Sequence, residues 1–213
     1  MIILEKRRKT DPPAVLSSDG PIPDGMQNVP RILAVVGSLR EQSLNRQLAV
    51  LAGQALGNRA VFEVLDYRDI PLFDQDEEFP APAAVARVRR QVLEADALWF
   101  FSPEYNHFFP GVLKNLVDWL SRPPAPDEPP VLVGKPAALS GISPGQGATL
   151  QAQDHLVTLL SFLDVRLMNV PRLAIPRAAE QLTDGKLILR DSAPYLQRQA
   201  DAFLAFITQE QRP

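Results

Sequence analysis

The stretch RILAVVGSLREQSLNR, residues 31–46, determines the fold that we expect for this chain. Residues 32–36 form an apolar run of the kind that makes a buried strand, and the run stops at Gly37. A loop of hydroxyl, guanidinium and amide side chains follows, and we expect a helix from about Ser43 to Leu56. A buried strand, a glycine turn and a helix start together indicate a phosphate-binding loop.

The loop after this strand offers hydrogen-bond donors to an anion. The free N–H groups at a helix start and the positive end of the helix dipole both favour negative charge. The side chains that can add donors are Ser38, Arg40, Ser43 and Asn45. The glycine-rich patterns GxxxxGK[ST] and GxGxxG are both absent, because Ser38, Leu39 and Arg40 follow Gly37. Side-chain hydroxyls in place of bare glycine backbone suit one terminal phosphate better than a bridging pyrophosphate.

Composition narrows the class of protein. The chain has 213 residues, of which 46% are apolar, so a globular domain with a sizeable core is expected. A net charge of −3 argues against a nucleic-acid partner held by phosphate neutralisation. Zero cysteines exclude disulfides, thiol catalysis and cysteine metal sites, and are compatible with the cytoplasm. We see no secretory signal and no apolar stretch long enough for a membrane span, so no membrane association is expected.

Short apolar strands alternate with helical segments along the rest of the chain. The predicted strands are Arg31–Val36, Ala60–Leu65, Ala97–Phe101, Pro136–Gly141 and a fifth around Arg166–Ala174. The predicted helices are 43–56, 83–94, 110–120, one that ends near 163, and 192–208. This alternation predicts an α/β fold, a three-layer, doubly wound, five-stranded parallel sheet of flavodoxin-like order 2-1-3-4-5. Ligands of such sheets bind at the carboxyl ends of the strands, so the loops after strands one, three and four should hold the chemistry.

One proline-rich segment precedes the predicted domain and another lies within it. Residues 1–29 contain four prolines and little apolar periodicity, and we expect an extension that is disordered or draped over a neighbouring subunit. The folded domain is then 30–213. Residues 122–130 contain five prolines and are expected to form an extended surface loop, and Thr183–Lys186 has the residues of a tight turn.

A second long motif, SPEYNHFFPGVLKNLVDWLSRP at residues 102–123, follows the third strand. Pro103 and Pro110 bracket a short loop, which fixes its backbone and can aim its N–H groups outward. A planar heteroaromatic ring with acceptor and donor edges could be recognised by such a loop, and Tyr105 offers stacking area. Gly111 lets a ring or a neighbouring backbone come close.

Taken together, GSLREQSLNR at 37–46 and PEYNHFFPGVLKNLVDWLSRP at 103–123 resemble the NADPH-dependent FMN reductase family, which includes bacterial quinone, chromate and azo-dye reductases. The resemblance covers residues from about Arg31 to Pro171. It implies an FMN-dependent NAD(P)H oxidoreductase with a flavodoxin-like fold and non-covalent FMN. A hydride would pass from NADPH or NADH through FMN to a flavin, a quinone or a similar small acceptor. No acid or base is obligatory for that transfer, so we name no catalytic residue.

The resemblance also implies which residues contact FMN. The phosphate ligands would be Ser38, Arg40, Ser43 and Asn45. The residues lining the isoalloxazine edge, mainly through backbone N–H groups, would be Pro103, Glu104, Tyr105 and Asn106. The loop from about Gly141 to Gly147, including Ser143, would approach the pyrimidine end of the ring. Family members often continue this loop with a Gly-Gly pair and an arginine, whereas Ala148, Thr149 and Gln151 stand here. That departure concerns NADPH phosphate recognition or subunit contact and leaves FMN binding untouched.

Simpler interpretations remain open for single residues. Ser43 serves as a helix N-cap whatever else it does, and Glu104 could bridge to a lysine or to a backbone N–H group. Tyr105 is either a stacking residue or an aromatic at the rim. With His107 and His155 as the only histidines and no cysteine, no metal site is expected.

Two other functions remain open. One is a flavodoxin-type electron carrier without its own pyridine-nucleotide site, although such carriers are usually more acidic. The other is a phosphate-binding interaction module without catalysis. The helix carrying Trp119, the proline-rich linker and the N-terminal arm predict a homodimer or homotetramer.

Overall fold

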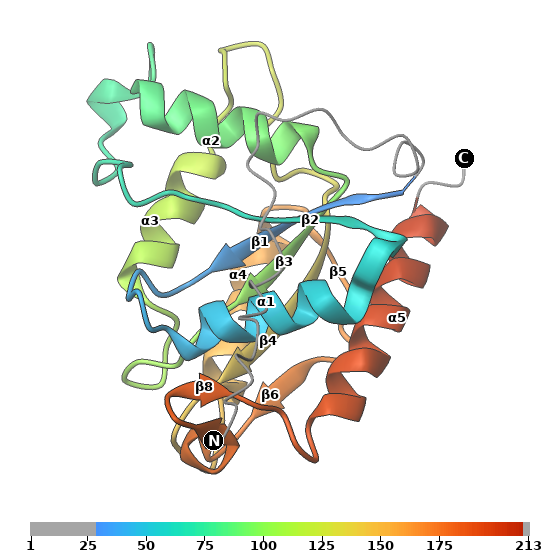
Figure 1. The fold of residues 1–213 in the computed structure, drawn as a ribbon. Coiled ribbons are helices and arrows are strands. Elements are labelled where there is room, and N and C mark those ends of the chain that lie inside the picture. The colour runs from blue at the N-terminus through green and yellow to red at the C-terminus, as the bar shows by residue number, and fades with distance from the viewer. Residues whose placement is uncertain (1–28, 211–213) are drawn as a thin grey trace, which may run out of the picture.

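A computed structural model describes residues 29–210, which form a parallel sheet enclosed by helices (Figure 1). The strands are β1 Arg31–Val36, β2 Val61–Val64, β3 Ala97–Phe101, β4 Pro136–Ile142, β5 Arg166–Leu167 and β6 Leu173–Ile175. Their order is β2-β1-β3-β4-β5, every pair in this sheet is parallel, and β6 also pairs with β4. The predicted doubly wound, flavodoxin-like order is confirmed. The predicted extension at 1–29 lies outside the described residues, apart from Val29.

The predicted fifth strand is wrong in one respect, because it is split in two. β5 pairs with the start of β4 and β6 with its end, while residues 168–172 between them leave the sheet. Pro171 cannot donate a hydrogen bond to a ladder, which explains the interruption. The amide of Gln199 occupies the gap, since its Nε2 donates to the carbonyls of Leu139 (2.8 Å) and Pro171 (3.0 Å).

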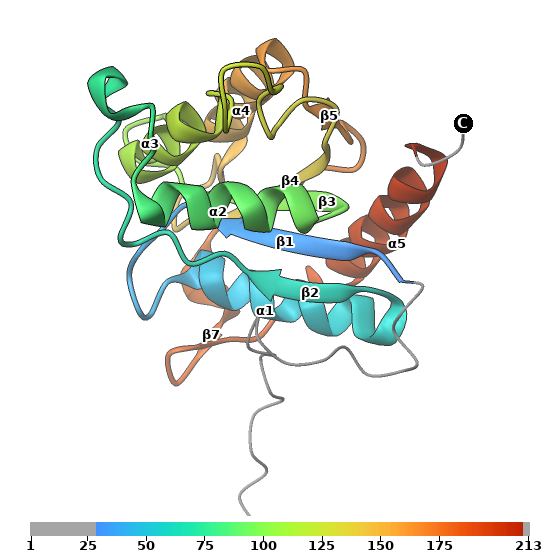
Figure 2. The same ribbon diagram turned by 90° about the horizontal axis from the view of Figure 1, so that it is seen from above.

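Five helices cover the sheet, close to their predicted bounds. They are α1 Leu44–Leu56, α2 Ala83–Glu94, α3 Gly111–Leu120, α4 Leu150–Phe162 and α5 Ala193–Glu210. Figure 2 shows α2, α3 and α4 on one face of the sheet and α1 with α5 on the other. Within residues 29–210, no helix has both the length and the apolar character that crossing a membrane requires.

Side chains along the central strands point alternately to the two faces of the sheet, and a hydrophobic core lies on each face. In β3, Ala97, Trp99 and Phe101 face α1 and α5, whereas Leu98 and Phe100 face the other three helices. All five side chains are fully buried. Burying a large apolar side chain contributes about 1.5–3 kcal/mol, so these two cores hold the strands in one register. The carboxyl ends of β1, β3 and β4 therefore meet at one edge.

A small hairpin and the proline-rich linker lie outside the main sheet. After the 3₁₀ segment η4 (Ala178–Gln181), β7 (Leu182–Thr183) and β8 (Lys186–Leu187) pair antiparallel around Asp184 and Gly185, both with positive φ. The predicted tight turn is confirmed. The Gln47 side chain of α1 anchors this hairpin, accepting from Leu187 N at 2.7 Å. The linker at 122–130 runs as turns and bends rather than as one extended segment.

Two further 3₁₀ segments complete the described chain. η2 (Gly57–Arg59) follows α1, which ends where Gly57 adopts φ +60°, a conformation that glycine takes without strain. η3 (Gln75–Glu77) lies in the long connection between β2 and α2. That connection is bound to the end of α3 by a bidentate ion pair, in which Arg122 Nε and Nη2 donate to Glu78 at 2.8 and 3.0 Å.

Candidate functional site

The loops after β1 and β3 touch at Gly37. Its backbone N–H donates to the carbonyl of Phe101 at 2.8 Å, at the end of β3. A Cβ on Gly37 would lie 3.3 Å from atoms of Leu113, Pro103 and Ser102, so a larger residue would push the two loops apart. Two of the three loops predicted to hold the chemistry are thus in direct contact at this glycine.

Three of the four predicted phosphate ligands lie in the loop that leads into α1. Ser38 and Ser43 are buried, with 5% and 3% of their surface exposed, whereas Arg40 is exposed at the top of the loop. Ser43 caps α1, because its Oγ accepts from Arg46 N at 3.3 Å. The first turn of α1 carries no acidic residue, so its positive end is uncompensated from within the helix.

The backbone of this loop is rich in available donors. Among residues 29–210, none accepts a hydrogen bond from the backbone N–H groups of residues 38–42, 44 and 45. Buried or half-buried N–H groups of proteins are nearly always paired with protein, water or a ligand. Such a concentration of unpaired donors at a helix start fits the terminal phosphate of a nucleotide.

Asn45, the fourth predicted phosphate ligand, makes other contacts. Its Nδ2 donates to the carbonyl of Ile142 and its Oδ1 accepts from Ile142 N, both at 3.1 Å. The side chain thereby joins the start of α1 to the end of β4. A primary amide has two N–H groups and one of them remains, so a phosphate contact stays a prediction.

The residue that the sequence reasoning missed is Arg46. It lies in the first turn of α1, and its Nε is buried without a hydrogen-bond partner among the described residues. Leaving such a donor unpaired costs roughly 1–3 kcal/mol, which favours an acceptor at this place. The sequence did contain a signal for it, namely its position three residues after the N-cap. Residues three apart lie on the same face of a helix, so the Arg46 side chain is on the same face as Ser43.

The loop after β3 is a tight two-residue turn. Tyr105 and Phe108 exchange backbone hydrogen bonds of 2.9 and 3.0 Å, and Asn106 and His107 between them have φ of 53° and 63°. Both positive φ values match a hairpin turn of type I′. Pro103 is buried beneath the turn, whereas Tyr105 and Asn106 are exposed.

This turn also has backbone donors without partners in the described chain. No residue of the described chain accepts a hydrogen bond from the N–H groups of Glu104 and Asn106. The Glu104 carboxylate points elsewhere, because its Oε2 accepts from Ala152 N in α4 at 3.1 Å. The bridge from Glu104 to a backbone N–H, one of the two interpretations weighed for it, is therefore present.

The loop after β4 is packed from within. A Cβ on Gly141 would collide with Thr149 Oγ1 and with the carbonyl of Ser102, so only glycine fits there. Ser143 is buried and its Oγ donates to the carbonyl of Ala148 at 2.5 Å. Gly141 and Ser143 thus shape the loop, and residues 144–147 form its exposed rim.

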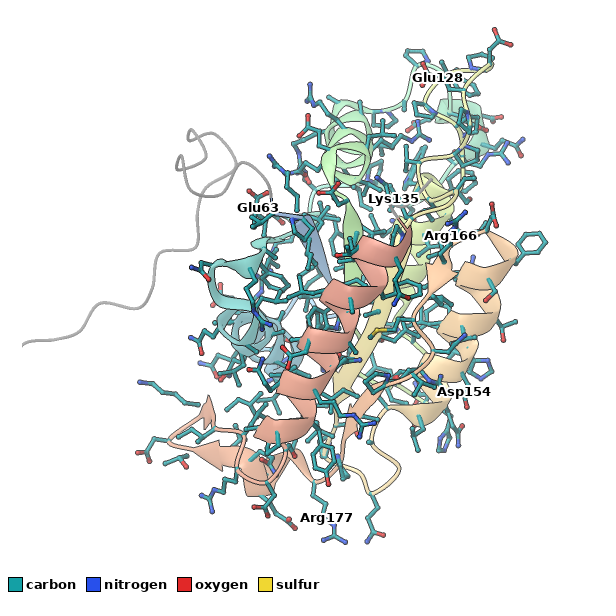
Figure 3. All side chains as sticks on the ribbon, turned by 90° about the vertical axis from the view of Figure 1, so that its right-hand side faces the viewer. Glu63, Glu128, Lys135, Asp154, Arg166 and Arg177 are labelled. Carbon is teal, nitrogen blue, oxygen red and sulfur yellow. The ribbon has the colours of Figure 1, made fainter. Side chains whose placement is uncertain are left out.

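Residues 177 and 178 are hydrogen-bonded to this loop, a contact that the sequence did not indicate. Arg177 N donates to the carbonyl of Gly145 at 3.2 Å, and Ala178 N donates to that of Ser143 at 3.0 Å. Figure 3 shows Arg177 at this end of the molecule, opposite the end where Lys135 and Arg166 lie. Within the described chain, the N–H groups of residues 145–147 have no acceptor and are available to a ligand.

A mainly apolar cleft of about 410 Å³ lies beside the first loop. Its lining is Leu39, Tyr67, Arg68, Ile70, Leu72, Gly111, Val112 and Asn115. Tyr67 supports the end of β1, because its hydroxyl donates to the carbonyl of Val36 at 2.6 Å, and burial raises its pKa. Asn115 fixes the opposite wall by donating to the carbonyl of Pro71 and accepting from Phe73 N, both at 2.8 Å.

One histidine lies in the turn after β3 and the other packs against it. His107 Nδ1 lies 3.5 Å from Glu104 Oε1, and the His155 ring of α4 lies 4.3 Å from the ring of Phe108. Within residues 29–210, no three residues of the types histidine, cysteine, aspartate and glutamate are grouped to hold a metal ion.

Comparisons with known proteins agree with this geometry. The family model described as NADPH-dependent FMN reductase matches residues 30–180. The chain is 36% identical over 178 residues to a 2-hydroxy-1,4-benzoquinone reductase of Burkholderia sp, an alignment that spans 83% of this chain and 96% of that protein. It is 38% identical over 179 residues to an NAD(P)H-dependent FMN reductase of Pseudomonas aeruginosa, spanning 83% and 95%.

A solved structure is similar over nearly the same range. The flavoenzyme NAD(P)H:(acceptor) oxidoreductase FerB of Paracoccus denitrificans superposes with a TM-score of 0.78 at 33% identity. The match covers 85% of this chain and 99% of that chain. The residues that the family model matches, 30–180, include β1 to β6, α1 to α4 and all three loops described above.

Proposed function

The chain belongs to the NADPH-dependent FMN reductase family, and from this premise we propose how its residues hold FMN and which acceptor it reduces. It is an FMN-dependent NAD(P)H oxidoreductase. The chemistry that FMN supplies when bound is to accept a hydride from NAD(P)H and to pass the electrons on. The protein contributes binding, orientation and electrostatics.

The phosphate of FMN binds at the start of α1. Ser38 and Ser43 supply buried hydroxyls, Arg40 closes the loop from the solvent side, and the buried Nε of Arg46 adds a donor. The unpaired backbone N–H groups of residues 38–42, 44 and 45 are the single observation that carries this assignment. Asn45 contributes by joining α1 to β4, with its remaining N–H available to the phosphate.

The isoalloxazine ring lies between the loops after β3 and β4. The unpaired N–H groups of Glu104 and Asn106 would donate to one edge of the ring, and the exposed Tyr105 would cover its rim. The N–H groups of residues 145–147, held in place by Gly141 and Ser143, face the pyrimidine end. Backbone donors at fixed positions suit the carbonyl and nitrogen edges of a flavin.

A quinone-type compound is the acceptor that we propose. The relatives named as quinone reductases support it, as does the mainly apolar cleft lined by Leu39 and Val112, whose character suits an apolar ring. Holding donor and acceptor rings about 3–3.5 Å apart in a fixed orientation is then the main catalytic contribution of the protein.

A homodimer or homotetramer is proposed as the active form. Trp119 cannot provide the interface, because it is only 1% exposed and its Nε1 donates to the carbonyl of Pro71 inside the chain. Exposed apolar side chains that also line the cleft, such as Leu72 (83%) and Val112 (37%), support an interface at the mouth of the cleft instead. Light scattering at micromolar concentration should give at least twice the mass of 23.5 kDa, and a monomer would contradict it.

Purified protein tests the proposed function directly. It should be yellow, or become so with added FMN, and should bleach without oxygen when NADPH or NADH is added. A panel of quinones, azo dyes and chromate should then give the highest kcat/KM with a quinone. Colourless protein that ignores FMN would contradict the cofactor assignment. Bound flavin that only a partner reductase can reduce would instead indicate the electron carrier.

A further inference from the structure

Helix α4 starts without a cap from its own sequence. Thr149 precedes its first residue, yet the Thr149 side chain makes no capping hydrogen bond to the helix. Its Oγ1 accepts instead from Gln153 Nε2 at 3.0 Å, and both side chains are fully buried. The N–H groups in the first turn of α4 therefore need partners from elsewhere.

That partner is a carboxylate from the loop after β3. Glu104 Oε2 accepts from Ala152 N at 3.1 Å, across 48 residues of sequence. The Glu104 side chain is only 13% exposed, and an anion at this end of a helix is favoured by its dipole. A side chain that caps a helix start stabilises it, and here that side chain comes from a different loop.

A second contact holds the same turn to the same helix. The Phe108 ring lies 4.3 Å from the ring of His155, which stands three residues after Ala152 on α4. The other oxygen of Glu104, Oε1, lies 3.5 Å from His107 Nδ1 at the tip of the turn. Glu104 and Phe108, at the two ends of the turn, thus contact α4 directly, and His107 at its tip is connected to α4 through Glu104.

We propose that Glu104 is a positioning residue that joins the loop after β3 to the loop after β4 before FMN binds. The proposal rests on the proposed function, in which these two loops hold the isoalloxazine ring from two sides. Because residues 144–147 end only two residues before α4 begins, capping α4 from the opposite loop restrains the distance between the two sets of backbone donors. Preorganisation of this kind raises affinity by lowering the ordering cost of binding.

Three substitutions at Glu104 separate the hydrogen bond from the charge. E104A removes both. E104D keeps the charge, but its side chain is one methylene shorter and cannot reach Ala152 N. E104Q loses the charge and retains an oxygen that can accept from Ala152 N. The matched control is D154A, which removes another acidic residue, one that lies on α4 (Figure 3). Asp154 pairs with Arg172 at 2.7 Å and is not part of the cap.

The readouts are the Kd for FMN, measured by quenching of flavin fluorescence, and hydrogen exchange of residues 104–108 and 145–153 in the FMN-free protein. We expect E104A and E104D to weaken FMN binding about tenfold and to speed exchange in both loops. E104Q should recover most of the affinity, and D154A should match the wild type. Urea unfolding of each variant shows whether affinity falls by more than global stability does.

Several results would overturn the inference. Wild-type affinity in E104A or E104D would show that the loops need no such connection. Equal losses in E104Q and E104A would show that the hydrogen bond is not what positions them. If E104A does not fold, E104D and E104Q still decide. Failure of the wild type to bind FMN would overturn the proposed function instead, so the two failures are distinguishable.

Discussion

The two halves of the site are built from different material. At the start of α1, buried serines, an exposed arginine and a helix end offer side-chain and backbone donors together. The loops after β3 and β4 offer almost only backbone, shaped by positive φ at Asn106, His107 and Ala148. Ligand binding at the start of α1 depends on which side chains are present. In the loops after β3 and β4 it depends on residues that are small enough, or that adopt positive φ, to keep the backbone in its conformation.

The largest effect on the free energy of unfolding is expected at Gly141, where the structure leaves no room for a side chain. In G141A the new Cβ would collide with Thr149 and Ser102, so the start of α4 must move away from β3. Overpacking of this kind costs roughly 1–3 kcal/mol of unfolding free energy, and FMN affinity should fall by about tenfold or more. Urea unfolding and flavin titration measure the two. Because nothing lies within 4 Å of a Cβ on Gly147, G147A should leave stability unchanged, and equal losses would refute the argument.

The side-chain half should lose affinity without losing stability. Arg40 is exposed and no ion pair is recorded for it within residues 29–210, so R40A should change the unfolding free energy by less than about 0.5 kcal/mol. A charge-assisted hydrogen bond to phosphate is worth about 1.5–3 kcal/mol, which corresponds to roughly 10- to 100-fold in the Kd for FMN. R90A, an exposed arginine of α2, is the control and should bind FMN normally. An unaffected Kd in R40A would remove this residue from the site.

Alkaline pH tests the contribution of Tyr67, which supports the end of β1 next to the first loop. Burial raises the pKa of Tyr67, whereas a tyrosine in the unfolded chain ionises near pH 10. The unfolded state therefore loses its proton first, and stability from this group is present below about pH 10 and falls as pH rises further. The Y67F substitution should lower the free energy of unfolding by about 1 kcal/mol at neutral pH, because the hydrogen bond to Val36 is lost. Above pH 10, the free energy of unfolding of Y67F should fall less steeply than that of the wild type. Parallel slopes for both proteins in urea unfolding would contradict this.

The smallest effect concerns a strained residue in the backbone half. Ala148 has φ of 53°, a conformation that costs a non-glycine residue roughly 1–2 kcal/mol. A148G relieves that cost but adds unfolded-state entropy, so we expect stability to rise slightly, by no more than about 1 kcal/mol. The same change in a helix, A86G in α2, should instead destabilise by about 1 kcal/mol. A loss of equal size in both variants would show that position 148 is not strained.

The sequence was most informative where periodicity and residue type decide the structure. Arg31–Val36, Ala83–Glu94 and Ala97–Phe101 are present with the predicted bounds, because buried strands and amphipathic helices leave a periodic signal. The split of the fifth strand depends on Gln199, which is remote in sequence and replaces a missing ladder donor. No local pattern reports such a contact.

The same limit applies to the site. The hydroxyls and arginine of the first loop could be identified by residue type, but the engagement of Asn45 with Ile142 could not, since the two are 97 residues apart. Likewise the sequence placed Glu104 on the correct loop without showing that it caps α4. The position of Arg46 three residues after the N-cap could have singled it out, but its buried Nε without a partner is visible only in the folded structure.

The most direct test of the account compares FMN with riboflavin, which lacks the phosphate and keeps the ring. If the start of α1 holds the phosphate, wild-type protein should bind FMN at least about 100-fold more tightly than riboflavin. The double variant R40A/S43A should lose most of that preference while its affinity for riboflavin stays the same. Equal affinity of the wild type for both flavins, or a preference that survives in the double variant, would contradict the claim.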